Sequence, residues 1–280
     1  MFVWRAYAKI NLVLDVLGRL PGGYHEVSTV IQTISLADRV FIEPGGRGVT
    51  VTCSIAELSG PQNLAYRAAE LFMGLTGEKL DVRIHIEKHI PVQAGLGGGS
   101  SDAACVLKAL NWLTGSRFTC GTLAKEAELL GADVPFLVIG GTAWARGKGE
   151  QVTVLPPIRQ FLVVVKPEFG LSTEYVYNMY DESGFPPVRP DAEQAVQAIY
   201  SGNRERLLES LGNVFEPVVA KYYPVVSYMK EDLLKLGAEK AFMTGSGPAV
   251  VGLVRSHEQA VRLAGSLREK YAFVYAGYTV

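Results

Sequence analysis

The sequence predicts an α+β protein of two domains. Apolar residues alternate with polar ones in several short runs, which is the period of a half-buried strand, and they recur at helical spacing in other runs. The two kinds of run are mixed without the regular strand-helix order of a doubly wound or barrel fold. The segment around Pro156-Pro157 is the best linker candidate, so we expect an N-terminal domain over residues 1–155 and a C-terminal domain over residues 156–280.

The first part of the chain is predicted to be rich in strands. Alternating apolar residues indicate strands over residues 10–16, 27–33, 40–42 and 49–53. Lys9 and Asn11 alternate with the apolar residues Ile10 and Leu12 of the first strand. Both polar side chains are therefore expected on the face opposite the core. An exposed lysine on a strand is usually only solvated.

The remaining elements follow from helical spacing and from short apolar runs. A helix is expected from Asn63, which can cap it, to an end at Gly77. Later helices are predicted over residues 103–113, 123–130, 173–180, 191–200, 225–236 and 257–270. Strands are predicted over residues 80–86, 136–139, 161–165 and 273–278, and on both sides of residues 244–248.

Composition and charge exclude several classes of protein. Lys and Arg number 27 against 28 Asp and Glu, so no overall positive field favours a nucleic-acid partner. No window approaches the roughly 20 apolar residues of a membrane helix, and the first residues do not resemble a signal peptide. Three cysteines without paired spacing favour a reducing compartment. We therefore expect a cytoplasmic protein without nucleic-acid or membrane partners.

A glycine-rich loop lies between a predicted strand and a predicted helix. Its glycines leave backbone N–H groups unshielded and permit positive φ, and the helix start, with Ser100 or Ser101 as its N-cap, adds free amides and a positive dipole end. Oxygens of a polyphosphate would fit there, although such loops also serve tight packing. The residues of this candidate phosphate site are Pro91, Gly95, Leu96, Gly97, Gly98, Gly99, Ser100 and Ser101.

Two familiar phosphate loops do not fit this stretch. The Walker motif requires a Gly-Lys-Ser/Thr ending, which is absent here. The dinucleotide fingerprint places its third glycine where this chain has Ser100, and it should open the first strand-turn-helix unit. A nicotinamide-dependent oxidoreductase is therefore a weak alternative.

Other candidate residues are ambiguous when each is taken alone. Asp133 lies in a Gly-Ala-Asp-Val-Pro turn before the predicted 136–139 strand, where it could be catalytic or a simple turn residue. Tyr24 and His25 follow a double-glycine turn and could be surface residues. The four histidines show no metal-ligand spacing, so the sequence leaves any metal ligands unknown, and there is no Gly-x-Ser-x-Gly nucleophile elbow.

Five motifs in order along the chain carry a resemblance. They are Ala-Lys-Ile-Asn-Leu at 8–12, Gly-Tyr-His-Glu at 23–26, Gly-Leu-Gly-Gly-Gly-Ser-Ser-Asp-Ala at 95–103, Gly-Ala-Asp-Val-Pro at 131–135 and Thr-Gly-Ser-Gly-Pro at 244–248. Together they resemble the GHMP small-molecule kinases, over nearly the whole chain. Within that superfamily they are most similar to the branch that acts on a cytidine diphosphate methylerythritol.

This resemblance implies a fold and a reaction. The N-terminal part would resemble domain 2 of ribosomal protein S5, and the C-terminal part would be ferredoxin-like. The reaction would transfer the γ-phosphate of ATP, with Mg²⁺ sharing the phosphate charge, to the 2-hydroxyl of the substrate, in the non-mevalonate isoprenoid pathway. By matching positions, Asp133 would be the catalytic base and Lys9 its partner, because an ammonium keeps a nearby carboxylate ionised.

The resemblance also assigns the binding residues. The loop from Pro91 to Ser101 would hold the phosphates and Asn63 would lie near the adenine. The methylerythritol substrate would be bound by Asn11, Tyr24, His25, Tyr177, Gly245 and Ser246. Tyr175 is the rival of Tyr177 for stacking on the cytosine. His25 can read a cytosine edge by pairing donors with acceptors.

Two alternative functions remain beside this hypothesis. One is another GHMP kinase that acts on a mevalonate-like acid, homoserine or a sugar, against which the Gly-Tyr-His-Glu motif argues. The other is a non-catalytic relative that kept the fold, against which the retained Lys9 and Asp133 argue. We expect a small-molecule substrate and a monomer or weak homodimer.

Overall fold

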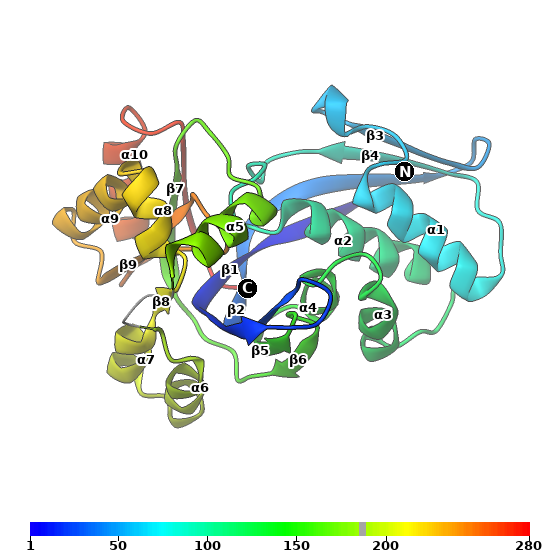
Figure 1. Ribbon diagram of the computed structural model, residues 1–280. Helices are drawn as coiled ribbons and strands as arrows, with labels where there is room; N and C mark the ends of the chain where they lie inside the picture. Colours follow the sequence, from blue (N-terminus) through cyan, green and yellow to red (C-terminus); the bar gives the residue numbers. More distant parts are fainter. Residues whose placement is uncertain (185–188) are drawn as a thin grey trace. The chain divides into compact units, whose positions relative to one another are not determined.

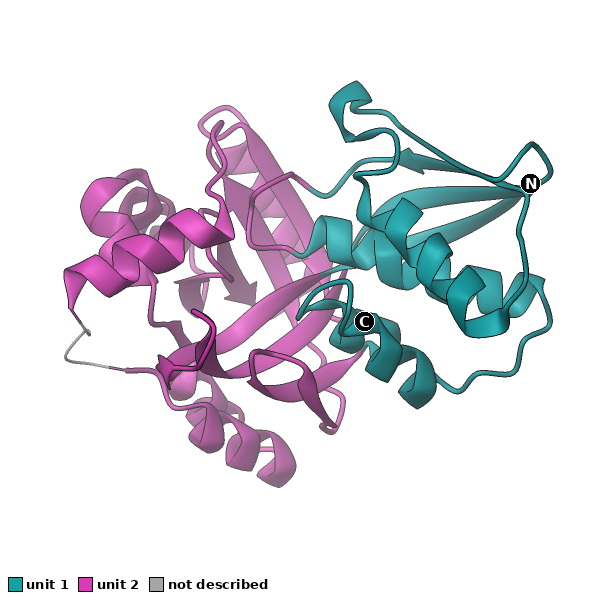
Figure 2. Cartoon of the chain, turned by 45° about the vertical axis from the view of Figure 1, so that its right-hand side comes forward, with its two compact units in different colours: residues 1–8, 36–90, 97–140 teal, residues 9–35, 91–96, 141–280 magenta. Residues whose placement is uncertain are grey.

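The computed structural model describes residues 1–184 and 189–280, and these form two compact units. Unit 1 contains residues 1–8, 36–90 and 97–140, and unit 2 contains residues 9–35, 91–96 and 141–280 (Figure 2). Both units mix helices and strands, so the predicted α+β class is confirmed. The units are interleaved along the chain rather than separated by one cut, and the predicted domain boundary near residue 155 stays a prediction.

Unit 1 is built on the second half of a long strand. The strands are β2 (His25–Pro44), β3 (Val49–Cys53) and β4 (Val82–Glu87), together with the start of β1 (Phe2–Arg19). Strand β4 pairs antiparallel with β2 and parallel with β3. The helices are η1 (Ala56–Leu58), α1 (Leu64–Thr76), α2 (Gly98–Leu113), α3 (Cys120–Ala127) and α4 (Val134–Ile139), with α2 packed against α1 and α4 (Figure 1).

The core of unit 1 follows from alternation on β4 and from small residues on α1. Val82, Ile84 and Ile86 are buried while the residues between them are exposed. On α1, buried alanines and Phe72 form the face that meets α2. Each fully buried large aliphatic or aromatic side chain contributes about 1.5–3 kcal/mol, so these residues are a main source of stability in unit 1.

Unit 2 contains a four-stranded antiparallel sheet in the order β11-β7-β10-β9. Its strands are β7 (Phe161–Lys166), β9 (Lys240–Met243), β10 (Val250–Val254) and β11 (Phe273–Tyr278). The first half of β2 pairs antiparallel with β5 (Thr142–Gly147), which pairs with β6 (Gln151–Val154). Strand β1 pairs in parallel with the short β8 (Gly212–Asn213).

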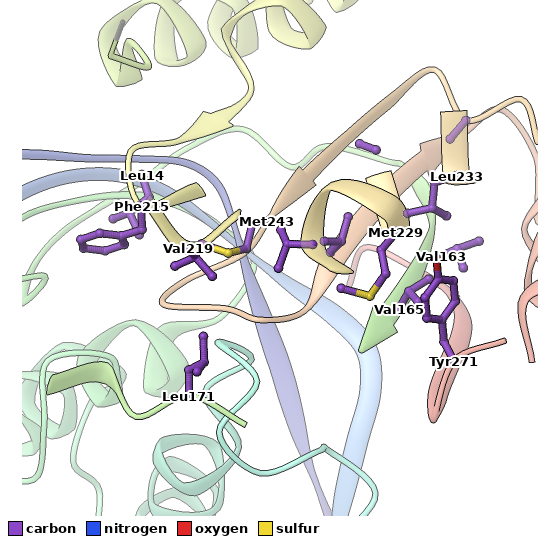
Figure 3. Close-up of a cluster of buried hydrophobic side chains, with 14 of the residues drawn as sticks. Leu14, Val163, Val165, Leu171, Phe215, Val219, Met229, Leu233, Met243 and Tyr271 are labelled. Atoms are coloured by element: carbon purple, nitrogen blue, oxygen red, sulfur yellow. The ribbon is translucent and has the colours of Figure 1, made fainter. Parts of the chain in front are cut away.

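The helices of unit 2 complete its hydrophobic core. They are α5 (Thr173–Ser183), α6 (Ala192–Ser201), α7 (Arg204–Ser210), α8 (Glu216–Tyr222), α9 (Val225–Lys235) and α10 (His257–Leu267). Figure 3 shows side chains from β7, α8 and α9 meeting in one cluster, among them Val163, Val219 and Met229. Phe215 and Met243 belong to the same cluster, so it borders the segments that carry the glycine turn described below.

Some elements differ from the sequence prediction. Residues 134–139 form helix α4 instead of a strand, with Pro135 in its first turn. A short apolar run does not distinguish a buried strand from a buried helix, and proline is favourable at a helix start because its missing N–H has no partner there anyway. The separate strands predicted at 27–33 and 40–42 are one strand, β2, and the sequence did not predict β5, β6, α7 or α8.

The expected exposure of Lys9 and Asn11 is also wrong. Each residue is only 4% exposed. Strand β1 is an interior strand whose residues are buried on both faces over Ala8 to Asp15. The alternation of apolar and polar residues therefore does not mark a solvent-exposed face here. The lysine is therefore part of the protein interior.

Within the described residues no helix is both long and apolar enough to cross a membrane. The three cysteines are free, with Cys53 and Cys105 buried and Cys120 exposed.

The N-cap of α1 can be tested because both groups of its side chain are used. Asn63 Oδ1 accepts from the N–H of Ala65 (2.8 Å), and Asn63 Nδ2 donates to the carbonyl of Leu58 (2.7 Å). Replacement Asn63→Ala should lower the free energy of unfolding by about 1–2 kcal/mol in urea titrations, because a helix cap is lost. Asn63→Asp keeps the acceptor and should cost less. Equal losses for the two variants would contradict a capping role.

Candidate active site

The glycine loop and the glycine turn near the C-terminus touch through their backbones. Gly95 has a positive φ of 74°, and a Cβ built on it would lie 2.1 Å from the carbonyl oxygen of Thr244. Gly245 also has a positive φ, 57°, and its Cβ would lie 2.7 Å from the carbonyl oxygen of Gly95. No other residue type fits at either position, for steric reasons as well as for φ. Gly95 and Gly245, which are 150 residues apart in the sequence, thus lie against each other within unit 2.

A buried asparagine that the sequence analysis did not single out holds the glycine turn. Asn213 Nδ2 donates to the carbonyls of Met243 (2.9 Å) and Gly245 (2.8 Å), and its Oδ1 accepts from the N–H of Phe215. The backbone N–H of Asn11 donates to Thr244 Oγ1 (2.8 Å). Two strands, β8 and β1, therefore fix the turn.

The loop leads directly into the start of α2, and the predicted serine cap is wrong. The N-cap is Gly97, in the left-handed conformation, and no side chain caps the helix. The helix begins at Gly98, earlier than expected, because glycines allow the backbone to turn there without a polar side chain. Ser101 Oγ instead donates to the carbonyl of Tyr7 (2.6 Å). The N–H groups of the first turn are therefore not used by a side-chain cap, and N–H groups of this kind can bind an anion.

A buried charge cluster lies beside this first turn, within unit 1. Lys88 Nζ donates to Asp102 Oδ2 (2.7 Å) and to Asp38 Oδ2, and a Cβ on Gly98 would lie 3.3 Å from Lys88 Nζ. Asp38 Oδ1 accepts from the backbone N–H groups of His89 (2.5 Å) and Ile90 (2.7 Å). The cluster ties the end of β4 to α2.

The three charged side chains of this cluster do not all have a full set of hydrogen-bond partners. Asp102 Oδ1 is buried and has no hydrogen-bond partner among the described residues. Burial raises the pKa of Asp102 from 3.8 to about 7, against the opposing effect of Lys88. Burial lowers the pKa of Lys88, but the carboxylates of Asp102 and Asp38 outweigh this and raise it overall. Burial therefore favours the protonated form of Asp102 more than in a free carboxyl group.

A second buried polar network surrounds Lys9, within unit 2. Lys9 Nζ donates to Asn11 Oδ1 (2.7 Å), and Asn11 Nδ2 donates to Thr29 Oγ1 (2.8 Å). The backbone N–H of Lys9 donates to the carbonyl of Leu96 in the glycine loop (3.0 Å). The strand that carries the lysine is thereby attached to the loop, and Asn11 restricts where the ammonium can point.

Asp133 lies at the N-terminal end of α4, in unit 1, whereas Lys9 belongs to unit 2. The expected pairing of the two side chains stays a prediction. Pro135 in the first turn of α4 restricts the backbone next to Asp133, so its carboxylate is carried by an ordered helix start.

The residues expected at the cytosine end are grouped within unit 2. Tyr24 is 57% exposed, with Lys148 Nζ 4.0 Å from its ring centroid. His25 Nε2 lies 2.8 Å from Asp181 Oδ1, and the ring of Tyr177 lies 4.6 Å from that of His25. These contacts bring His25 next to Tyr177 and Asp181, although more than 150 residues separate them in the sequence.

The choice between Tyr177 and Tyr175 as the stacking residue stays open. Tyr177 also contacts Phe215, at 4.7 Å between ring centroids, and so is anchored in the core. Tyr175 is 45% exposed, and its hydroxyl accepts from that of Tyr223 (3.3 Å). Ser246 in the glycine turn is buried and lies within hydrogen-bonding distance of Thr173 Oγ1 (3.2 Å).

Comparisons with known proteins agree with this geometry. Residues 63–141 match the family model of the GHMP kinases N terminal domain, and residues 195–272 match that of the GHMP kinases C terminal. A homoserine kinase structure from Cytophaga hutchinsonii, 18% identical, shares the fold with a TM-score of 0.71 over 96% of this chain and 93% of its own. The fold and the two glycine motifs thus define a GHMP kinase.

Closer relatives narrow the class. The 4-diphosphocytidyl-2-C-methyl-D-erythritol kinase of Moorella thermoacetica is 48% identical over 95% of this chain and 94% of its own length. That of Desulfitobacterium hafniense is 44% identical over 98% and 94%. A crystal structure of 4-(cytidine 5'-diphospho)-2C-methyl-D-erythritol kinase has 36% identity and a TM-score of 0.85, covering 99% of both chains. The chain belongs to the 4-diphosphocytidyl-2-C-methyl-D-erythritol kinase family of the GHMP kinases.

The backbone contact of the two glycine motifs predicts an unusually costly substitution. Gly95→Ala should lower the free energy of unfolding by at least about 2 kcal/mol more than Gly115→Ala, measured by chemical denaturation. Gly115 is the matched control because its φ is also positive, 67°, while nothing lies within 4 Å of its Cβ position. Similar losses would mean that φ alone explains the glycine at 95.

The buried carboxyl of Asp102 predicts a pH dependence of stability. Its pKa in the folded protein, about 7, exceeds its ordinary value of 3.8. Between these values the folded protein keeps a proton that the unfolded chain has lost, so this contribution to stability is lost as the pH rises towards 7. Relative to Asp102→Asn, the wild type should lose about 2 kcal/mol between pH 5 and pH 8 in urea titrations. Parallel pH profiles would contradict this assignment.

Proposed function

We propose that this protein transfers the γ-phosphate of ATP to the 2-hydroxyl of 4-diphosphocytidyl-2-C-methyl-D-erythritol, a step in the non-mevalonate route to isoprenoids. The observation that carries the proposal is the glycine loop: Gly95 lies against the backbone of Thr244 and Gly245, and three residues later in the chain α2 begins at Gly98 without a side-chain cap. The full-length similarity to kinases named for this substrate supports the choice of acceptor.

As a GHMP kinase the protein uses ATP as phosphate donor. We assign the β- and γ-phosphates to the segment from Pro91 to Ser101, where the first amides of α2 are not used by a side-chain cap. Asn63 already caps α1, but its amide keeps one hydrogen and one lone pair that could contact the adenine.

The proposed chemistry at the acceptor needs a base and a positive charge. Asp133 would accept the proton of the 2-hydroxyl, and Lys9 would hydrogen-bond the same oxygen and keep Asp133 ionised. Lys9 is suited to this because Asn11 and Thr29 already orient its neighbourhood, so little freedom is lost on substrate binding.

Mg²⁺ is expected with the nucleotide rather than in a protein cage. Among residues 1–184 and 189–280 no group of three or more His, Cys, Asp or Glu side chains could hold a metal ion. Mg²⁺ commonly binds through substrate phosphates, water and one or two protein oxygens, and Ser100 provides a hydroxyl in the first turn of α2. When bound, the ion would share the charge of the transferred phosphate.

At the other end of the acceptor, we assign the cytosine to Tyr24, His25 and either Tyr177 or Tyr175. The methylerythritol would reach Asn11 and the turn at Gly245 and Ser246. The exposed ring of Tyr24 and the polar edge of His25 offer stacking and hydrogen bonding to a pyrimidine. Cytoplasmic location and a monomeric or weakly dimeric state remain predictions.

The test is the release of ADP from Mg-ATP in the presence of the cytidine diphosphate substrate. Asp133→Asn and Lys9→Met should each lower kcat by roughly 10²–10⁴ while the proteins remain folded by circular dichroism. Asp191→Asn is the matched control, because it retains the exposed cap of α6 and should leave the rate unchanged.

Two results would contradict parts of this proposal. Without ADP release from a folded wild type, the acceptor would be wrong, and mevalonate, homoserine and sugars would be tried instead. Full activity of Asp133→Asn would keep the kinase and remove Asp133 as its essential base.

A further inference from the structure

The imidazole of His25 is held in one orientation by its neighbours. Its side chain is only 8% exposed, and Nε2 lies 2.8 Å from Asp181 Oδ1. The ring of Tyr177 lies against it, tilted by 37° at 4.6 Å, and Phe215 supports Tyr177 from the core. Asp181 and Tyr177 therefore hold the ring in the orientation seen here.

The partner of His25 is an acceptor whose charge is already balanced. Asp181 Oδ2 pairs with Arg19 at 2.7 Å, so the carboxylate has a cation of its own. An ionised carboxylate can only accept hydrogen bonds, which requires a proton on His25 Nε2. In a neutral imidazole the other nitrogen, Nδ1, is then an acceptor.

The two common pyrimidines differ at the position such an acceptor would read. Cytosine carries an exocyclic amine, which donates, where uracil carries a carbonyl oxygen, which accepts. An acceptor nitrogen on His25 can accept a hydrogen bond from the cytosine amine. With uracil the same nitrogen would face a carbonyl oxygen, and two acceptors cannot form a hydrogen bond. Leaving buried polar groups unpaired is the strongest way for a site to reject a close analogue.

We propose that Asp181 is a specificity-determining residue: it fixes the tautomer of His25 with Nδ1 as acceptor and so selects a cytidine over a uridine diphosphate substrate. The inference rests on the proposed function, because it places the pyrimidine at His25. Asp181 acts through His25 and is a positioning residue without contact to the reacting atoms.

The first test is the tautomer itself in the full-length protein. Long-range ¹H–¹⁵N spectra of the histidine rings, with His25 assigned by the loss of its signals in His25→Gln, should show the proton of His25 on Nε2. In Asp181→Asn, whose amide can donate or accept, the signals should move towards the other tautomer or a mixture. A proton on Nδ1 in the wild type would overturn the inference.

The second test measures selectivity. We compare kcat/KM for cytidine and uridine diphosphate methylerythritol in the wild type and in Asp181→Asn. The ratio of the two values should fall roughly tenfold or more in the variant, mainly through KM of the cytidine substrate. A merely structural role would slow both substrates alike and leave the ratio unchanged, which would overturn the inference.

Asp232→Asn is the matched control in the same unit. Asp232 is 19% exposed against 18% for Asp181, and it likewise accepts from one cation, Lys270, and one neutral side chain, Tyr271. Its substitution should leave the selectivity ratio within about twofold. A ratio that falls equally in both variants overturns the specific role of Asp181.

The outcomes separate this inference from the proposed function. A wild type that phosphorylates both substrates equally well overturns the inference and leaves the kinase intact. If the wild type phosphorylates neither, the proposed acceptor is wrong and the inference falls with it.

Discussion

The backbone contact between Gly95 and the turn at Thr244 and Gly245 is the constraint on which the proposed site depends. It leaves no space for a side chain on either glycine, so the loop and the turn must be positioned together. Asn213 secures the turn from β8, and Lys9 secures the loop from β1 through the carbonyl of Leu96. Strands β1 and β8 thereby hold the loop residues up to Leu96 and the turn together within unit 2.

Buried polar groups are costly, and this protein holds several of them in small hydrogen-bonded networks. Lys9 and Asn11 form one network, and Lys88 bridges Asp38 and Asp102 in another. Apolar side chains of similar size in these positions would avoid the desolvation cost of buried charges. Buried charged side chains of this kind are not by themselves evidence of added stability.

Much of the architecture was readable from the sequence because it depends on local pattern. The caps at Asn63 and Gly77 and the strand over residues 273–278 follow from residue type and alternation, and the structure confirms them. The helix at 134–139 and the burial of Lys9 were missed because a short apolar run has no distinctive period and an interior strand has no wet face. Motif order identified the candidate site, but Asn213 and Asp181 carry no local signal: their roles arise from contacts across 32 and 156 residues.

The proposed ATP site requires that the amides at the start of α2 bind the phosphates of ATP. We would record ¹H–¹⁵N correlation spectra of the protein with and without a non-hydrolysable ATP analogue and Mg²⁺. We expect the largest shifts at the amides of Gly97, Gly98, Gly99 and Ser100, downfield as expected for charge-assisted hydrogen bonds. Saturable binding that leaves these amides unchanged and shifts others instead would contradict it.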